Sequence, residues 1–290
     1  MRPVPPQVLL LGGIASVQFG AAFANKLFAQ AGPGGTVLLR LTLSALMLTL
    51  AVRPSLRGRT RSDLRAVVAY GLILGTMNWS FYEAIDRLPL GVAVTIEFTG
   101  PLAVAIAGSR RALDGLWVLL AGGGVVLLAL RGDSHDISLA GVLLALVAGT
   151  CWAGYILISK RVGSTFAQLD GLAIALCIGT LVVIPAGIVQ GGSALLRPSV
   201  LLGGFAVAIL SSILPYSFEL VALRRISAAT FGILMSLEPA VAALAGVLVL
   251  GQALQPVTVA AIVMVVLASV GTTVAARRPV REPEMAEGPQ

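Results

Sequence analysis

Two glutamates stand close to prolines in stretches that are otherwise apolar enough for a lipid bilayer. Glu97 lies in TIEFTGPLAVAIAG, four residues before Pro101, and Glu238 directly precedes Pro239 in SLEPAVAALAG. Because proline lacks an amide hydrogen, the carbonyl four residues earlier loses its helical partner. A freed carbonyl beside a carboxylate is tolerated at membrane depth only where protein or water surrounds it. The pattern therefore predicts helix bends at Gly100, Pro101 and Pro239 that carry polar groups.

Two interpretations of Glu97 are open from the residues alone. Ionisable residues in transmembrane segments usually face a cavity or a partner, so Glu97 would line a cavity and carry a proton or bind the ammonium of a substrate. Alternatively, Glu97 is permanently paired with Arg40, which lies at a similar depth in another apolar segment. Arg40 has a second possible role of its own, because its planar guanidinium suits the carboxylate of an amino-acid substrate.

Other charged residues within the apolar segments suggest less central roles. Glu238 is either the counterpart of the Glu97 bend or a helix-start residue facing the positive end of a second half-helix. We expect Lys26 to extend its ammonium group toward the membrane surface. Glu83 and Glu219 lie near the ends of their segments, which favours an interfacial position for both.

Polar and aromatic side chains predict the lining of a cavity where they recur on one helix face. Residues four apart share such a face. The candidates are Asn78 with Tyr82, then Trp152 and Tyr155 with Ser159, and finally Tyr216 with Ser212 and Glu219. Pro215 predicts a further bend directly before Tyr216.

The composition places the chain among membrane proteins and argues against an enzyme. Of its 290 residues 57% are hydrophobic and 11% charged, with a mean hydropathy of +0.96, whereas soluble domains are about one quarter charged. The single histidine, His135, and the two cysteines, Cys151 and Cys177, lack the spacing of metal ligands. No nucleotide-binding loop is present. We therefore expect neither a metal nor a cofactor, and no catalytic residues.

Apolar segments long enough to cross a bilayer recur along the whole chain. A helix spans the hydrocarbon with about 20 apolar residues, and ten segments meet that length or approach it. They are residues 8–28, 36–52, 66–86, 91–109, 115–130, 139–159, 169–190, 200–222, 228–250 and 257–276. The predicted fold class is an all-α integral membrane protein with ten transmembrane helices.

The cations fall almost entirely on one side of this arrangement. One side carries fifteen: Arg2, Arg53, Arg57, Arg59, Arg61, Arg65, Arg110, Arg111, Lys160, Arg161, Arg224, Arg225, Arg277, Arg278 and Arg281. The other side carries three, Arg87, Arg131 and Arg197. Cytoplasmic loops of membrane proteins are enriched in Lys and Arg, so both termini are predicted to be cytoplasmic. Topology thus explains the net charge of +7 without a nucleic-acid partner.

An internal repeat relates residues 78–108 to residues 215–246. Ser80-Phe81 corresponds to Ser217-Phe218, and with one residue of slip Pro101 corresponds to Pro239. The repeat unit would contain five helices, so its two copies must have opposite orientations in the membrane. Inverted repeats with helices broken at corresponding places are typical of secondary transporters, whose substrate sites lie between the repeats. We predict repeats at 1–133 and 134–278, followed by a cytoplasmic tail at 279–290.

The motifs EFTGPLAVAIAGSRR, GTCWAGYILISKR and LPYSFELVALRRISAATFGILMSLEPAVAALAG carry a family resemblance. Together they resemble the EamA-type carriers of the drug/metabolite transporter superfamily, and most narrowly the threonine/homoserine exporter branch. The resemblance covers Gly12 to about Arg278. It implies two inverted five-helix repeats around a central cavity, and export of small amino acids from a bacterial cytoplasm.

These observations predict a secondary active transporter in the cytoplasmic membrane. Without an ATP-binding motif, transport must draw on an ion gradient or on the substrate's own gradient, and the buried carboxylates favour exchange with protons. Export of another small metabolite or a drug is the alternative. The partners expected are a small-molecule substrate and the lipid bilayer; the oligomeric state is left open.

Overall fold

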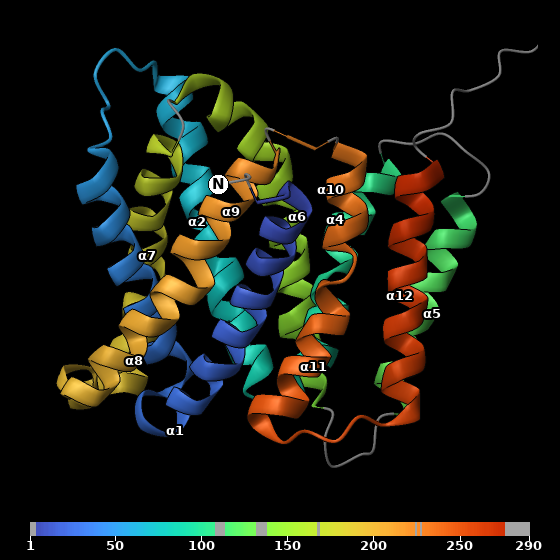
Figure 1. The fold of residues 1–290 in the computed structure, drawn as a ribbon. Coiled ribbons are helices and arrows are strands. Elements are labelled where there is room, and N and C mark those ends of the chain that lie inside the picture. The colour runs from blue at the N-terminus through green and yellow to red at the C-terminus, as the bar shows by residue number, and fades with distance from the viewer. Residues whose placement is uncertain are drawn as a thin grey trace, which may run out of the picture.

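The computed structural model describes residues 4–107, 114–131, 138–166, 169–223, 225–226 and 228–275, and these residues form helices without any β-strand. Figure 1 shows the helices bundled side by side along one common direction. Several sequence predictions lie outside the described residues. They concern Arg2, Gly108, Arg110, Arg111, His135, Arg224, Arg277, Arg278, Arg281, the repeat boundary at 133/134 and the tail at 279–290.

The first two predicted spans form one element with a sharp bend. Helix α1 runs over Pro6–Val52, and its backbone leaves the helical conformation at Gly32, where φ is 66° and ψ is 167°. Glycine adopts a positive φ at little cost, and Pro33 follows it directly. The two arms of α1 therefore run in opposite directions, as the blue ribbon of Figure 1 shows. The expected loop between residues 28 and 36 is thus a tight reversal inside α1.

Most other predicted spans are observed within a few residues of their expected ends. They are α2 (Arg61–Ile85), α5 (Asp114–Arg131), α6 (Leu139–Thr165), α7 (Asp170–Gly191) and α12 (Pro256–Ala275). Helix α2 begins at a capping box, in which the Thr60 and Asp63 side chains each accept a hydrogen bond from the other's backbone amide. A short 3-10 turn, η1 (Gly192–Leu196), follows α7.

Two predicted spans are broken in the middle, at corresponding places. The fourth divides at Phe98 into α3 (Leu90–Glu97) and α4 (Thr99–Ala107). The ninth divides at Ser236 and Leu237 into α10 (Ala228–Met235) and α11 (Glu238–Leu250). Each break begins three residues before a proline of the repeat, Pro101 or Pro239. The bends are therefore present, but each lies slightly ahead of its proline.

The eighth span contains the third bend as a change of helix type. It consists of α8 (Pro198–Ala208), a π-helical turn η2 (Ile209–Ile213) and α9 (Leu214–Leu223). The π turn ends just before Pro215, whose ring cannot continue an α-helical ladder. Such turns are frequently found at functional sites.

The outside of the bundle is apolar, which fits a multi-pass membrane protein. Leu119, Val189 and Leu202 are 74%, 84% and 70% exposed, and they lie on three different helices. Soluble monomers do not expose apolar surface on this scale. Seven helices of the described chain are long and apolar enough to cross a membrane, and α1 contains two of the predicted spans. The total of ten, and their arrangement as inverted repeats, stay predictions.

Small residues let the helices approach one another closely. A Cβ added to Gly75 of α2 would meet the Gly179 carbonyl of α7 at 2.6 Å, and one added to Gly100 of α4 would collide with the Gly149 carbonyl of α6. Gly91 of α3 faces Ala243 of α11 in the same way. Small residues at helix interfaces are characteristic of membrane bundles, and here Gly91 lets α3 pack directly on α11.

The connections separate into two ends of the bundle. Those between α1 and α2, α6 and α7, and α9 and α10 lie toward the top of Figure 1, and we call this the basic end. Its described cations are Arg53, Arg57, Arg59, Arg61, Arg65, Lys160, Arg161 and Arg225. The opposite end, where α11 joins α12, carries Arg87, Arg131 and Arg197 among the described residues. The structure thus groups the charges at the bundle ends as the sequence predicts.

Candidate functional site

A cavity of about 490 Å³ lies at the centre of the bundle and is lined by helices from both halves of the chain. Its walls come from both arms of α1, from α2 and α4, from the second half of α6, and from α9, α10 and α12, with single residues from the end of α3, from η2 and from the start of α11. The lining extends from the broken spans toward the basic end, because it includes Ala105, Ser159 and Thr273 but no residue of α3 before Glu97. The opposite half is closed by the contact of α3 with α11.

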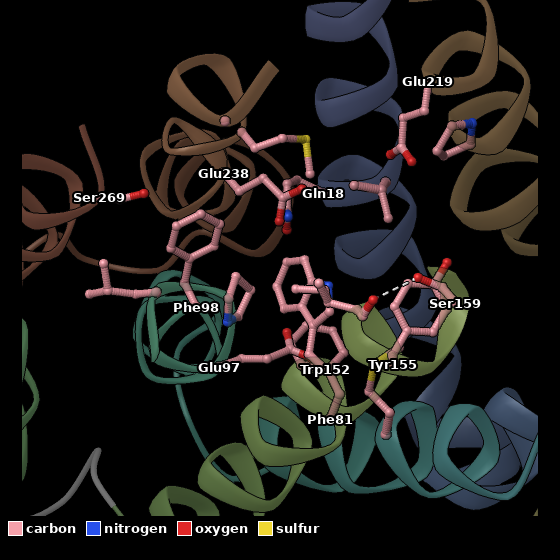
Figure 2. Close-up of a pocket in the computed structure, with 18 of the residues that line it drawn as sticks. Gln18, Phe81, Glu97, Phe98, Trp152, Tyr155, Ser159, Glu219, Glu238 and Ser269 are labelled. Atoms are coloured by element: carbon pink, nitrogen blue, oxygen red, sulfur yellow. Dashed lines mark hydrogen bonds between the residues drawn. The ribbon is translucent and has the colours of Figure 1, made fainter. Parts of the chain in front are cut away.

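Three carboxylates face this cavity from three different spans. Glu97 ends α3, Glu238 begins α11, and Glu219 belongs to α9. Figure 2 shows all three side chains directed into the same space. None of them forms a hydrogen bond or a 4.0 Å ion pair with another described residue. Their oxygens are therefore available to a ligand or a proton.

The Arg40 guanidinium lines the same cavity, and its hydrogen bonds within the described chain go to Ser211, Tyr82 and Ser212. Its Nη2 donates to the Ser211 carbonyl at 2.9 Å, its Nη1 to the Tyr82 hydroxyl at 3.3 Å, and its Nε to the Ser212 hydroxyl at 3.4 Å. No ion pair within 4.0 Å joins Arg40 to Glu97 among the described residues. A guanidinium has five N–H donors, so two stay available toward the cavity.

The position of Arg40 follows from the bend in the eighth span. In a regular helix the Ser211 carbonyl would accept from the amide of residue 215, but that residue is proline and has no donor. The carbonyl accepts from Arg40 instead. The neighbouring Leu210 carbonyl is used in a similar way and accepts from the Ser16 hydroxyl of α1 at 2.7 Å. Pro215 and the π turn thus build the polar support for this cation.

Aromatic rings form much of the remaining wall. Trp152 meets Phe98 edge to face, with ring centroids 5.7 Å apart. Tyr155 stacks on Tyr70 with centroids 5.1 Å apart. Phe98 lies at the break between α3 and α4, so the bend and the aromatic wall are parts of one feature.

The structure brings most of the predicted site residues together. Those that line the cavity are Arg40, Asn78, Glu97, Pro101, Trp152, Tyr155, Pro215, Tyr216 and Glu238. Tyr82 is fully buried behind the wall, where its hydroxyl supports Arg40. Gly100 and Pro239 are also absent from the lining; Gly100 instead packs against α6.

The structure also gives the positions of Glu83 and Lys26, for which the sequence suggests less central roles. Glu83 lies outside the cavity lining and binds Arg87 through its Oε2 at 2.7 Å, while its Oε1 accepts from Gln190 at 2.7 Å. Lys26 has an exposed side chain near the Gly32 bend.

Several lining residues were not singled out from the sequence. Gln18 of α1, Ser211 of the π turn and Ser269 of α12 are buried and line the cavity. The Ser211 hydroxyl has no hydrogen-bond partner among the described residues. Glu219 had two expectations, an interfacial position and a place on the lining face with Tyr216, and it faces the cavity. Gln18 was predictable from the sequence, because it is a polar residue inside an apolar segment.

The chain resembles known proteins both in sequence and in fold. The profile of the EamA-like transporter family matches residues 139–274. The threonine/homoserine exporter RhtA of Escherichia coli (strain K12) is 44% identical over 96% of this chain and 95% of its own length. RhtA of Salmonella typhimurium (strain SL1344) is 43% identical over 94% of this chain and 92% of its own.

A crystal structure at 20% sequence identity shares the fold with a TM-score of 0.63, over 93% of this chain and 97% of the other. The relatives are transporters, which confirms the prediction that the chain is not an enzyme. Because such high identity extends over nearly the whole length of both chains, this multi-pass membrane protein belongs to the EamA-like transporter family, in the branch of the threonine/homoserine exporters.

Proposed function

We propose that the protein is a secondary active transporter of the bacterial cytoplasmic membrane that exports small amino acids in exchange for protons. Its chain crosses the membrane ten times as two inverted repeats, 1–133 and 134–278, and both termini and the tail at 279–290 face the cytoplasm. The matched breaks at Phe98 and Ser236 support the repeat, and the cations of the basic end support the orientation. In this orientation the central cavity lies in the cytoplasmic half.

A single guanidinium and several carboxylates in one cavity support an amino acid as the substrate. An amino acid carries both charges, so its carboxylate would bind the free N–H donors of Arg40, in the planar geometry that arginine favours. Its ammonium would bind Glu97 or Glu238. This complementarity is the observation that carries the proposal, and the names of the relatives agree with it.

The imbalance of charge supports protons as the coupling ion. Three carboxylates line the cavity, those of Glu97, Glu219 and Glu238. Among the described residues, Arg40 is the only arginine or lysine in the lining. Like charges in a confined, weakly solvated space disfavour full ionisation. At least one carboxyl group would therefore hold a proton when the cavity is empty, and binding of a substrate ammonium would displace it.

The experiment is a substrate panel in inside-out membrane vesicles, with and without a pH gradient. We expect threonine and homoserine to accumulate when the vesicle interior is acidic, and accumulation to collapse when a protonophore removes the gradient. Vesicles without the protein supply the control. Accumulation that does not depend on the pH gradient would contradict proton exchange but would leave the export of amino acids standing.

Export of another small metabolite is the second candidate, favoured by the apolar and aromatic share of the lining, which includes Phe81, Phe98 and Trp152. Amino acids lacking a hydroxyl and small aromatic cations belong in the same panel. A preference for those compounds over threonine and homoserine would select this alternative.

A further inference from the structure

A second, smaller cavity of about 170 Å³ adjoins the central one near the basic end. The two cavities share a wall of four residues, Tyr155, Ser159, Tyr216 and Glu219. Beyond this wall the smaller cavity is lined by Tyr70 of α2 and by residues on both sides of the connection between α6 and α7. Glu219 is the only carboxylate among its lining residues in the described chain, and it also faces the central cavity.

The outer part of the smaller cavity reaches the polar surface of the bundle. Gly163 lines it, is exposed, and offers open space to an added Cβ. Phe166 also lines it, and the Arg59 guanidinium lies 4.6 Å from the centre of that ring. The same arginine donates a hydrogen bond to the Thr165 carbonyl. An arginine at this depth marks the aqueous edge of the membrane rather than its hydrocarbon.

We propose that Glu219 exchanges its proton with the cytoplasm through this smaller cavity, while the amino acid enters and leaves by the central one. The inference rests on the proposed function. In the step considered, the O–H bond of the Glu219 carboxyl group breaks and the proton passes to solvent in the smaller cavity. The carboxylate left behind attracts the ammonium of the amino acid that binds in the central cavity.

Two observations favour a proton over the amino acid in this cavity. The smaller cavity has about a third of the volume of the central one, and its described lining contains no guanidinium for a substrate carboxylate. Its polar groups are hydroxyls and one carboxylate, which bind water and protons readily. The ionisable groups that face Glu219 are Tyr155 of α6, Tyr216 of its own helix, Tyr70 of α2 across the smaller cavity and Glu238 of α11.

The test places a removable block at Gly163. In a background with Cys151→Ala and Cys177→Ala, Gly163→Cys is reacted with a neutral benzyl methanethiosulfonate in proteoliposomes. The matched control is Ser164→Cys, which adds the same thiol one residue away and outside the described lining of either cavity. The protein folds before it is labelled, so the bulky group is added at residue 163 only after the fold has formed.

Two quantities are measured before and after labelling. One is threonine counterflow at equal pH on both sides, which needs no net proton movement, and the other is threonine-driven proton flux reported by a trapped pH dye. We expect labelled Gly163→Cys to lose proton flux about tenfold, the scale on which a positioned proton carrier acts, and to keep counterflow. Labelled Ser164→Cys should keep both.

Other outcomes would overturn the inference. Equal loss of counterflow and proton flux would make the smaller cavity part of the substrate path, and no loss of either would leave it without a role. Failure of the reagent to label Gly163→Cys, measured by mass spectrometry, would mean that the smaller cavity is closed to solvent at residue 163. A separate result, the absence of threonine counterflow in the unlabelled protein, would reject the proposed function itself.

Discussion

At the scale of single residues, Arg40 is held in the cavity wall by hydrogen bonds, and none of the described contacts of the cavity's charged groups is an ion pair. Arg40 uses three donors to bind Ser211, Ser212 and Tyr82, and these contacts fix its position without a carboxylate. Of the two interpretations of Glu97, a permanent pair with Arg40 has no ion pair behind it in this structure. Glu97 as a group that binds protons or substrate therefore becomes the more economical hypothesis.

Replacement of Glu97 by glutamine tests this hypothesis. Glu97→Gln keeps the shape of the side chain and removes its charge, and Arg40 keeps its other contacts. We expect the variant to fold with an unchanged melting temperature and to lose gradient-driven threonine transport by at least about tenfold, as a lost proton carrier would. A permanent pair would behave differently: stability would fall by several kcal/mol, and adding Arg40→Gln would recover part of the loss.

The guanidinium of Arg40 should matter for its geometry as well as its charge. Arg40→Lys preserves the charge but loses the planar fork that grips a carboxylate. We expect the KM for threonine to rise about tenfold, equivalent to ~1.4 kcal/mol of binding, measured by initial rates in vesicles. Tyr82→Phe, which removes one acceptor behind the cavity, is the graded comparison and should have a smaller effect. Equal effects of the two variants would argue against direct contact of Arg40 with substrate.

At the scale of helices, bends and close approaches work together. The break between α3 and α4 brings Glu97 and Phe98 to the cavity, and Gly100 directly after it allows α4 to touch α6 backbone to backbone. Helix association in lipid depends on such packing because apolar surface by itself provides little driving force between helices. The bend and the glycine are therefore two parts of one local structure.

Addition of one methyl group at Gly100 should be costly. In Gly100→Ala the new Cβ collides with the Gly149 carbonyl, which is backbone and cannot rotate away. We expect a loss of about 1–3 kcal/mol, typical of overpacking, seen as a lower melting temperature in detergent. The matched control is Gly122→Ala on α5, where the added Cβ meets nothing within 4 Å. That change should be neutral or slightly stabilising, because alanine favours helix.

At the scale of the whole molecule, the basic end and the cavity lie on the same side of the bundle. The closed half around α3 and α11 then faces the outside in the proposed orientation, so the structure represents a state open or poised toward the cytoplasm. An exporter must take its substrate from that side. The proposed direction of transport and the position of the cavity are therefore compatible.

The orientation can be tested with single cysteines in the background lacking Cys151 and Cys177. Ser55→Cys lies in the connection between α1 and α2, and Ser193→Cys lies in η1 at the opposite end. In intact cells, a membrane-impermeant maleimide should label only Ser193→Cys, while permeabilised cells should label both. External labelling of Ser55→Cys would overturn the assigned orientation and with it the argument from charge distribution.

Sequence alone determined the features that depend on local chemistry. Apolar length sets where the chain can cross a bilayer, and a missing amide hydrogen sets where a helix must bend. Both signals act within a few residues, so the spans, the bend regions and the two carboxylates beside prolines were predictable without a structure. The family motifs in EFTGPLAVA and SLEPAVAALAG were equally local.

The tertiary structure decided which of these features meet. The Ser211 carbonyl that holds Arg40 is 171 residues away in the chain, and the wall shared by the two cavities joins α6 to α9. In a soluble helix, a polar face shows which side points outward, but these helices are apolar on nearly every side. Their facing is set by close contacts between small residues such as Gly100 and Gly149. For that reason the sequence left Glu219 with two expectations, at the interface or in the lining, and put Tyr82 in the lining, whereas packing directs Glu219 into the cavity and Tyr82 behind it.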